Sequence, residues 1–370
     1  IDWDQPFENN FTVAEEVTIN GDSERRPDLV IYVNGIALVI IELKRSKVSV
    51  HEGIRQNIRN QEPGYIQKFF TTVQLLFAGN DTEGLYYGVI KTPEKFWLRW
   101  KEPCGDPCGK SVFTPEKYSI ELDRSVLQFL QPQRLLWFIQ YCIVFDAGIK
   151  KAARPNQFFA LQAAQTRVTD KDKGIIWHSQ GSGKSLTMIW LAKWIRDNQK
   201  DARVVIITDR DELDKQIESV FKGTDENISR AKSGDELVTM LNHANPWLIC
   251  TLIHKFGAKD ETDSIQIGSK KAAKSLEAYL EDVADKLPAD YSPKGNIFVF
   301  VDECHRSQTG LLHEAMLKIV GENAMLIGFT GTPLLKSDKK SSFETFGSYI
   351  HTYKFDEAVK DGVVLDLQYE

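Results

Sequence analysis

A series of short apolar runs in the second half of the chain constrains the fold more than any other feature. Each run is bounded by polar or glycine residues and alternates with amphipathic helical stretches. The runs cover residues 174–177, 204–208, 247–251, 297–301 and 324–329. Short apolar segments without polar alternation are what strands need when a parallel sheet is buried on both faces. Because strands alternate with helices, we expect right-handed crossovers and an α/β, doubly wound parallel sheet.

The first part of the chain follows another pattern. Residues 1–120 mix strand-like segments with turns, and residues 121–149 form an apolar, helix-like stretch that is interrupted near Pro132. A chain of 370 residues is long for one hydrophobic core. We therefore predict a mixed α/β domain over residues 1–148, with a helical spacer at its end, and the doubly wound domain over residues 149–370. Residues 257–295 are predicted to be a charged insertion with one helix.

Bulk composition excludes several classes of protein. With 42% hydrophobic and 26% charged residues, the chain is neither disordered nor fibrous. Its net charge of −6 argues against a surface coated with DNA but allows a local basic channel. No apolar segment is long enough to cross a membrane, and the first residues are not a signal peptide. Scattered cysteines without zinc spacing favour a reduced, cytoplasmic location.

A glycine-rich loop between a predicted strand and a predicted helix carries the clearest chemistry. Residues 174–177 lead into Gln-Gly-Ser-Gly-Lys-Ser at 180–185, and residues 186–195 follow as a helix. Such a loop turns backbone N–H groups toward phosphate oxygens, and the helix N-terminus adds positive potential. The predicted nucleotide-binding residues are Gly181, Ser182, Gly183, Lys184 and Ser185.

Within this loop, Lys184 would reach the β- and γ-phosphates of ATP, and the Ser185 hydroxyl would bind Mg²⁺. His178 stands where the strict form of the motif has its first glycine. A second apolar strand, 297–301, ends in Asp302 and Glu303. Asp302 would hold the same Mg²⁺, and Glu303 would orient or deprotonate the attacking water.

A predicted hairpin near the N-terminus carries a second set of reactive groups. Asn34-Gly35 separates two β-type runs, 29–33 and 36–41, which is a strong hairpin pattern. A strict two-residue turn would place Asp28 and Glu42 on opposite faces. A three-residue loop with a bulged glycine would shift the register by one and bring them to the same face, together with Lys44. We favour the shifted register, which would give a Mg²⁺ site with Lys44 beside the attacking water.

The second half of the chain resembles superfamily 2 helicases and translocases. Residues 302–305, Asp-Glu-Cys-His, are similar to their DExH box, and residues 330–333, Thr-Gly-Thr-Pro, are similar to their motif III. This resemblance implies that Gln157 reads adenine. It also implies a group of residues that couple ATP to DNA, namely Arg210, Thr251, Thr330 and Thr332. Only the first of two RecA-like lobes is expected here, so weak hydrolysis is expected, because a lost arginine finger costs about 10³–10⁵ in rate.

The first half resembles the PD-(D/E)xK nucleases, through Pro27-Asp28 and then Glu42-Leu43-Lys44. In type I restriction endonucleases a Gln-x-x-x-Tyr motif follows this core. Gln56 stands at that distance but has Asn60 in place of the tyrosine, and Gln61 with Tyr65 is the alternative. Glu15 or Glu16 could join Asp28 and Glu42 at the metal, and the sequence does not choose between them.

The order of these motifs along the chain closely resembles the N-terminal part of the R subunit of type I restriction enzymes. The resemblance implies a bacterial or archaeal subunit that pulls double-stranded DNA with ATP and Mg²⁺ and cuts it at non-specific sites. It further implies methylase and specificity subunits as partners. The absence of an initiator Met and the abrupt end at Glu370 suggest a fragment. Two alternatives stay open: a stand-alone helicase–nuclease for repair or phage defence, and a non-catalytic, ATP-gated DNA tether.

Overall fold

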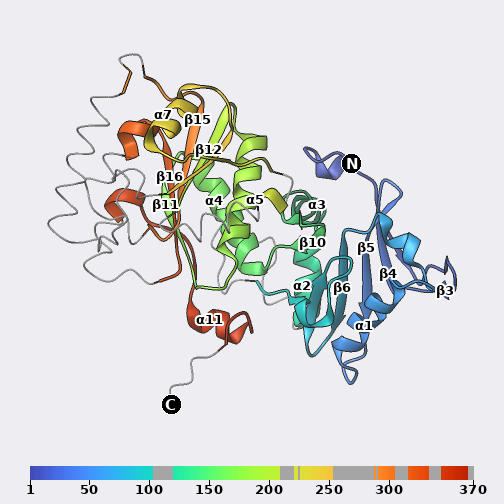
Figure 1. Cartoon of the computed structure of the whole chain (residues 1–370). Coiled ribbons are helices and arrows are strands. Elements are labelled where there is room, and N and C mark those ends of the chain that lie inside the picture. The colour runs from blue at the N-terminus through green and yellow to red at the C-terminus, as the bar shows by residue number, and fades with distance from the viewer. Residues whose placement is uncertain are drawn as a thin grey trace. The chain divides into compact units, whose positions relative to one another are not determined.

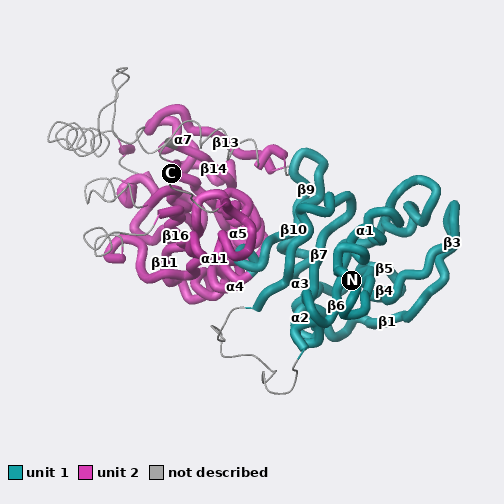
Figure 2. The backbone as a smooth tube through the Cα atoms, turned by 90° about the horizontal axis from the view of Figure 1, so that it is seen from below, with its two compact units in different colours: residues 1–158 teal, residues 159–370 magenta. Residues whose placement is uncertain are grey.

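The computed structural model describes residues 1–102, 120–208, 221–223, 226–252, 287–288, 291–304, 316–332 and 343–365. The chain divides into two compact units, Ile1–Phe158 and Phe159–Glu370 (Figures 1 and 2). Arg210 and most of the predicted charged insertion, 257–295, lie outside the described residues.

Unit 1 is built on a mixed sheet in which β5 and β6 run parallel and the other described strand pairs run antiparallel. The order across this sheet is β1-β4-β5-β6-β7-β8. Its strands are β1 (Phe11–Glu15), β4 (Leu29–Val33), β5 (Ile36–Leu43), β6 (Leu75–Asn80), β7 (Gly84–Gly88) and β8 (Leu98–Arg99). Two small hairpins accompany it, β2 (Ile19–Asn20) with β3 (Glu24–Arg25), and β9 (Ile143–Asp146) with β10 (Ile149–Ala152).

The helices of unit 1 bury the sheet through two hydrophobic clusters. The α-helices are α1 (Val50–Asn60), α2 (Glu121–Phe129) and α3 (Pro132–Tyr141), with short 3₁₀ turns at η1 (Pro6–Glu8), η2 (Gln67–Thr71) and η3 (Glu94–Phe96). Ile54 of α1 packs in a cluster with Ile40 and Leu76 of the sheet. An aromatic cluster joins the sheet to α2 and α3, and its Trp100 and Phe129 rings lie 4.3 Å apart. The predicted interruption near Pro132 is confirmed, since Pro132 begins α3.

The predicted hairpin forms, but its register shift arises at another place than we expected. The turn has two residues, Asn34 and Gly35, both with positive φ (52° and 79°), and it pairs Val33 with Ile36. Positive φ at both positions is typical of the tight turns that match strand twist. The predicted three-residue loop is therefore wrong. The shift occurs instead within the strands, where pairing changes between Ile31 and Tyr32, so that Leu29 faces Ile41.

This bulge produces the shared face that the sequence argument required. With Leu29 opposite Ile41, the next position outward sets Asp28 opposite Glu42. Residues that face each other across an antiparallel pair project to the same side, and every second residue of a strand does so too. The correct register thus follows from an extra residue in β5 instead of an extra residue in the loop.

Unit 1 extends past the predicted boundary at residues 148 and 149. That boundary falls in the turn between β9 and β10, and the hairpin bonds back to the rest of unit 1. Lys150 Nζ donates to Gln74 Oε1 at 2.6 Å, and the Tyr87 hydroxyl donates to the carbonyl of Ala153 at 2.6 Å. The two compact units meet within α4 (Pro155–Thr169). The boundary between the predicted cutting and motor domains stays a prediction.

Unit 2 contains the doubly wound sheet. All its strand pairs are parallel, in the order β13-β14-β12-β15-β16-β11-β17. The strands are β11 (Gly174–His178), β12 (Ala202–Thr208), β13 (Ser229–Arg230), β14 (Leu248–Leu252), β15 (Asn296–Val301), β16 (Met325–Thr330) and β17 (Tyr349–Tyr353). Its other described helices are α5 (Lys184–Asn198), α7 (Gly234–Asn242) and α11 (Phe355–Lys360).

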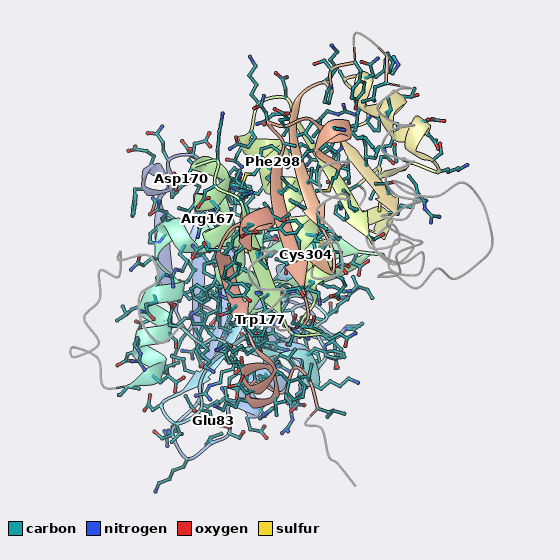
Figure 3. The ribbon with its side chains drawn as sticks, turned by 90° about the vertical axis from the view of Figure 1, so that its left-hand side faces the viewer. Glu83, Arg167, Asp170, Trp177, Phe298 and Cys304 are labelled. Carbon is teal, nitrogen blue, oxygen red and sulfur yellow. The ribbon has the colours of Figure 1, made fainter. Side chains whose placement is uncertain are left out.

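Each of the five apolar runs is one of these strands, which confirms the predicted fold class. Most of their side chains are buried, as is Cys304, which follows β15. Figure 3 labels Phe298 of β15 and Cys304. Because the strands are parallel, the loops that follow β11, β16 and β15 leave the same edge of the sheet, and these strands are neighbours. Among the described residues, no helix is both long and apolar enough to cross a membrane.

Candidate functional site

Asp28, Glu42 and Lys44 converge at the end of the β4–β5 hairpin. Lys44 Nζ lies 3.7 Å from Asp28 Oδ2 and 3.8 Å from Glu42 Oε2. The backbone N–H of Leu43 donates to Asp28 Oδ2 at 2.6 Å, which fixes the Asp28 carboxylate against β5. The hairpin therefore brings together the three residues that the sequence predicted.

Glu42 is an unusual member of this group, because its side chain is fully buried. Among the described residues, neither of its carboxylate oxygens has a hydrogen-bond partner. Burial, and secondarily the Asp28 carboxylate, raise the pKa of Glu42 from 4.5 to about 8, although Lys44 opposes the shift. A buried carboxylate without hydrogen bonds is costly unless cations compensate its charge. The site is therefore suited to a positive ligand beyond Lys44.

The helix α1 buries Glu42 because Gly53 lets it approach the sheet closely. A Cβ at Gly53 would lie 3.2 Å from the Cβ of Ala78 and 3.3 Å from the carbonyl oxygen of Glu42. Ser49 caps this helix by accepting from the N–H of His51 at 3.3 Å, and Glu83 binds the N–H of Val50 at 2.6 Å. Such bonds satisfy the free N–H groups of the first turn and hold the helix in place.

Asp28 and Glu42 are a donor set that could hold Mg²⁺. Two carboxylates share one face, and the described residues contain no group of three or more His, Cys, Asp or Glu side chains that could hold a metal ion. Mg²⁺ is usually held by one or two carboxylates, with waters and substrate phosphates as its other ligands. A single pair of carboxylates therefore suffices when phosphate completes the site.

Glu15 and Glu16 are placed differently with respect to this carboxylate pair, and whether Glu16 joins it stays open. Glu15 lies opposite Leu29, so strand alternation directs it to the face away from Asp28. Glu16 forms an ion pair with Arg26.

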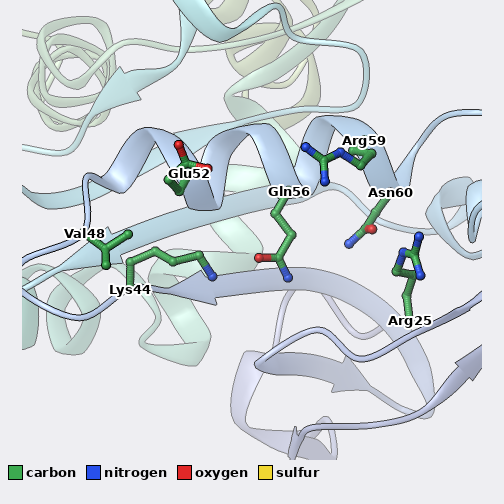
Figure 4. Close-up of a pocket in the computed structure, with 7 residues that line it drawn as sticks. All are labelled: Arg25, Lys44, Val48, Glu52, Gln56, Arg59 and Asn60. Atoms are coloured by element: carbon green, nitrogen blue, oxygen red, sulfur yellow. The ribbon is translucent and has the colours of Figure 1, made fainter.

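A pocket of about 500 Å³ opens beside Lys44 and runs along α1 (Figure 4). Lys44 and Gln56 point toward each other across it, and Arg25 reaches in from β3. Its lining residues are Arg25, Lys44, Val48, Glu52, Gln56, Arg59 and Asn60. Gln61, the alternative glutamine, is instead bonded to backbone: its Oε1 accepts from Lys91 and its Nε2 donates to Asn57. Of the two candidate glutamines, only Gln56 lines the pocket.

Sequence reasoning missed the arginines of this pocket. Arg59 stands three residues after Gln56, a spacing that places both on one side of a helix and could have identified it. The Arg25 guanidinium carbon lies 4.5 Å from the centre of the Tyr65 ring, a cation–π contact. No sequence spacing indicates that contact, since Tyr65 lies forty residues further along the chain.

In unit 2, the glycine-rich loop follows β11 as predicted. Gly181 and Gly183 have positive φ (81° and 88°), and Gly183 is the residue that precedes α5. Ser182 is buried, and its hydroxyl donates to the carbonyl of Ser179 at 2.6 Å, which closes the loop. Lys184 and Ser185 begin α5, where the helix N-terminus favours phosphate.

Lys184 and Glu303 lie next to each other across this edge of the sheet. Lys184 Nζ is 3.9 Å from Glu303 Oε1, and Glu303 Oε2 accepts from the N–H of Gly331 at 3.4 Å. Glu303 has a φ of 47°, a conformation that favours glycine, and such strain is commonly found at functional sites. Asp302 is buried, and its Oδ1 accepts from the N–H of Glu303 at 3.0 Å. The loops after β11, β15 and β16 thus meet around one lysine.

The other predicted residues occupy defined positions. Thr330 ends β16, and its hydroxyl accepts from the N–H of Thr332 at 3.3 Å. Thr251 is buried in β14. Gln157 is buried in α4, and its Oε1 accepts from the N–H of Arg154 at 2.8 Å. The roles of these residues in binding adenine and DNA stay predictions.

Both halves of the chain match known protein families. The SWI2/SNF2 ATPase family matches residues 156–370, and the type I restriction enzyme R protein N terminus matches residues 1–95. A relative in Methanocaldococcus jannaschii, named as the type I restriction enzyme MjaIXP endonuclease subunit, is 29% identical; the match covers 100% of this chain and 35% of the relative. The type I restriction enzyme HindI endonuclease subunit of Haemophilus influenzae is 26% identical, with 100% and 36% covered.

The chain therefore spans about a third of the length of the curated relatives it matches. Among solved structures, the SWI2/SNF2 ATPase core of Sulfolobus solfataricus in complex with dsDNA is 15% identical, with a TM-score of 0.38. That match covers 60% of this chain and 39% of the other.

Proposed function

The chain belongs to the SWI2/SNF2 ATPase family, and on this premise we propose that it is the cutting domain and first motor lobe of a type I restriction enzyme. In this proposal the complete subunit moves double-stranded DNA by ATP hydrolysis and cleaves it at non-specific sites. The observation that carries the proposal is the convergence of Lys44 on Asp28 and Glu42, at 3.7 and 3.8 Å, in a chain that also holds an ATPase lobe.

In the cutting site, Asp28 and Glu42 would hold Mg²⁺. Bound there, Mg²⁺ would stabilise negative charge on the scissile phosphate. Lys44 lies between the two carboxylates and would hold or orient the attacking water, as its ammonium group also attracts the phosphate. Gln56 faces Lys44 across the pocket and would hydrogen-bond the same water or a phosphate oxygen.

In the motor lobe, Lys184 would leave Glu303 for the β- and γ-phosphates of ATP when the nucleotide binds. Ser185 and Asp302 would hold the Mg²⁺ that accompanies the nucleotide, and Glu303 would orient the attacking water. The distance of 3.9 Å between Lys184 Nζ and Glu303 Oε1 supports this exchange, because both groups already lie at the loop that would bind the phosphates.

The proposed restriction activity also implies DNA and protein partners. Relatives are named as endonuclease subunits of type I restriction enzymes, so we propose that methylase and specificity subunits supply sequence recognition. The arginines of the pocket, Arg25 and Arg59, carry the charge that a DNA backbone requires there. Cleavage without sequence preference agrees with a site that offers charge and metal ligands.

The decisive test of this function is Lys184→Ala in the complete subunit, assembled with its partner subunits. Without Lys184, ATP binding is lost, so DNA cleavage that depends on translocation should stop. A non-catalytic tether would instead leave cleavage intact. Unchanged cleavage with Lys184→Ala would therefore contradict the motor and favour the tether.

A further inference from the structure

His178, the residue that replaces the first glycine of the phosphate-binding motif, has no role in the proposed chemistry. His178 is the last residue of β11, directly before the loop, and its side chain is completely buried. A buried imidazole must satisfy at least one ring nitrogen, or the cost of desolvation is not recovered. The partner that satisfies it therefore bears on how the loop is held.

That partner is His351 of β17, the edge strand beside β11. His178 Nε2 and His351 Nδ1 lie 2.9 Å apart, and their ring centroids are 5.1 Å apart. One ring must donate and the other accept, so the bond requires that the accepting ring be neutral. Burial lowers the pKa of His351 to about 4, and burial with the charges of His351 and Lys184 holds the pKa of His178 well below its usual range. Both rings are therefore neutral at physiological pH.

The segment that begins with β17, residues 349–364, holds the phosphate-binding loop at two further points. The N–H of Ser179, next to His178, donates to the carbonyl of Tyr353 at 2.9 Å. After α11 the chain returns, so that a Cβ at Gly181 would lie 3.2 Å from Cγ1 of Val364. The Tyr353 hydroxyl donates to Asp361 at 2.9 Å, which ties the end of β17 to the end of α11. Residues 349–364 thus contact the loop on its entering strand and at its apex.

We propose that His351 is a positioning residue for the phosphate-binding loop, acting through its hydrogen bond to His178, and that residues 349–364 brace this loop for ATP. The inference rests on the proposed function of Lys184. In the strict motif a glycine leaves the loop free to adopt its turn. Here an imidazole occupies that place, and β17 supplies the bond that holds it in one orientation. Lys184 then points into the site from a fixed loop.

A purely structural histidine pair makes a different prediction. If the bond only stabilised the contact between β11 and β17, its loss would lower the melting temperature and leave the affinity for ATP unchanged. If the bond positions the loop, its loss weakens ATP binding even at temperatures where the protein is fully folded. Affinity and thermal stability must therefore be measured on the same variants.

The experiment compares the dissociation constant of Mg·ATP by calorimetry for the unaltered 370-residue chain and its variants. His351→Leu removes the bond, and His351→Asn restores a polar atom near the position of Nδ1. Thr352→Ala is the matched control, since Thr352 is the next residue of β17 and alternation places it on the other face. His351→Gln, whose amide reaches beyond the position of Nδ1, replaces His351→Leu if that variant does not fold.

We expect His351→Leu or His351→Gln to weaken ATP binding roughly tenfold, the factor that corresponds to about 1.4 kcal/mol. His351→Asn should recover most of the affinity, and Thr352→Ala should match the unaltered chain. Unchanged affinity with His351→Leu or His351→Gln would overturn the inference while leaving the proposed function in place. If the unaltered chain bound ATP no better than Lys184→Ala, the proposed function would fail first, and this inference with it.

Discussion

Glu42→Gln tests how the buried Glu42 carboxyl makes the free energy of unfolding depend on pH. The folded protein raises the pKa of Glu42 from 4.5 to about 8, chiefly by burial. The folded state therefore binds a proton that the unfolded state releases, and stability from this group is lost as pH rises from 4.5 toward 8. Each pKa unit corresponds to about 1.36 kcal/mol. From about pH 5 to about pH 9, Glu42 alone should cost roughly 4 kcal/mol of unfolding free energy.

Glutamine does not titrate, so Glu42→Gln should lose this pH dependence. The buried amide will cost about 1–3 kcal/mol if it finds no partner, but that cost is the same at every pH. The assay is unfolding in urea at several pH values with a metal chelator present, comparing the variant with the unaltered chain. The variant should gain relative stability steadily as pH rises. Parallel pH profiles for the two proteins would refute a buried, protonated Glu42.

Adding Mg²⁺ to the same experiment tests the metal assignment. A cation that binds Asp28 and Glu42 favours the ionised carboxylate, so it should restore stability to the unaltered chain at high pH. Glu42→Gln should gain much less. Equal stabilisation of both proteins by Mg²⁺ would place the metal elsewhere.

Two further predictions concern the pocket and the helix beside it. Arg25→Ala should weaken DNA binding by the complete subunit and reduce the slope of log affinity against log salt by about 1. The control is Arg26→Ala, which removes an equal charge that is paired with Glu16 and should leave affinity and slope unchanged. Equal effects of the two variants would contradict a phosphate contact at Arg25. Gly53→Val should displace α1 and abolish cleavage, because even a Cβ at this position would lie 3.2 Å from the Cβ of Ala78. Calorimetry should show unchanged ATP binding in unit 2. Normal cleavage would show that the site tolerates a displaced helix.

The fold of unit 2 could be predicted from the sequence because buried parallel strands leave a strong and local pattern. Each apolar run became a strand, and the residues that follow β11 and β15 meet as the motif spacing required. Parallel strands place their ends at one edge whatever the loops between them do. Positions of the reactive groups in unit 2 therefore depended little on details that a sequence hides.

The cutting site depended on such a detail. Asp28 and Glu42 share a face only because one extra residue enters β5, and the Asn-Gly turn gave no indication of it. A bulge depends on packing of the strand against its neighbours, so the sequence could show that a shift was needed but not where it occurs. Arg25 and the partner of His178 were missed for a similar reason, since Tyr65 and His351 approach them through long-range contacts.

Lys44→Ala tests whether this chain carries two separable active sites. In the complete subunit assembled with its partners, we would measure DNA cleavage and ATP hydrolysis in the same reactions. Lys44 Nζ contacts Asp28, Glu42 and the carbonyl of Leu43, all in unit 1, so cleavage should be abolished while ATP hydrolysis continues at its normal rate. Equal loss of both activities would contradict the two-site account.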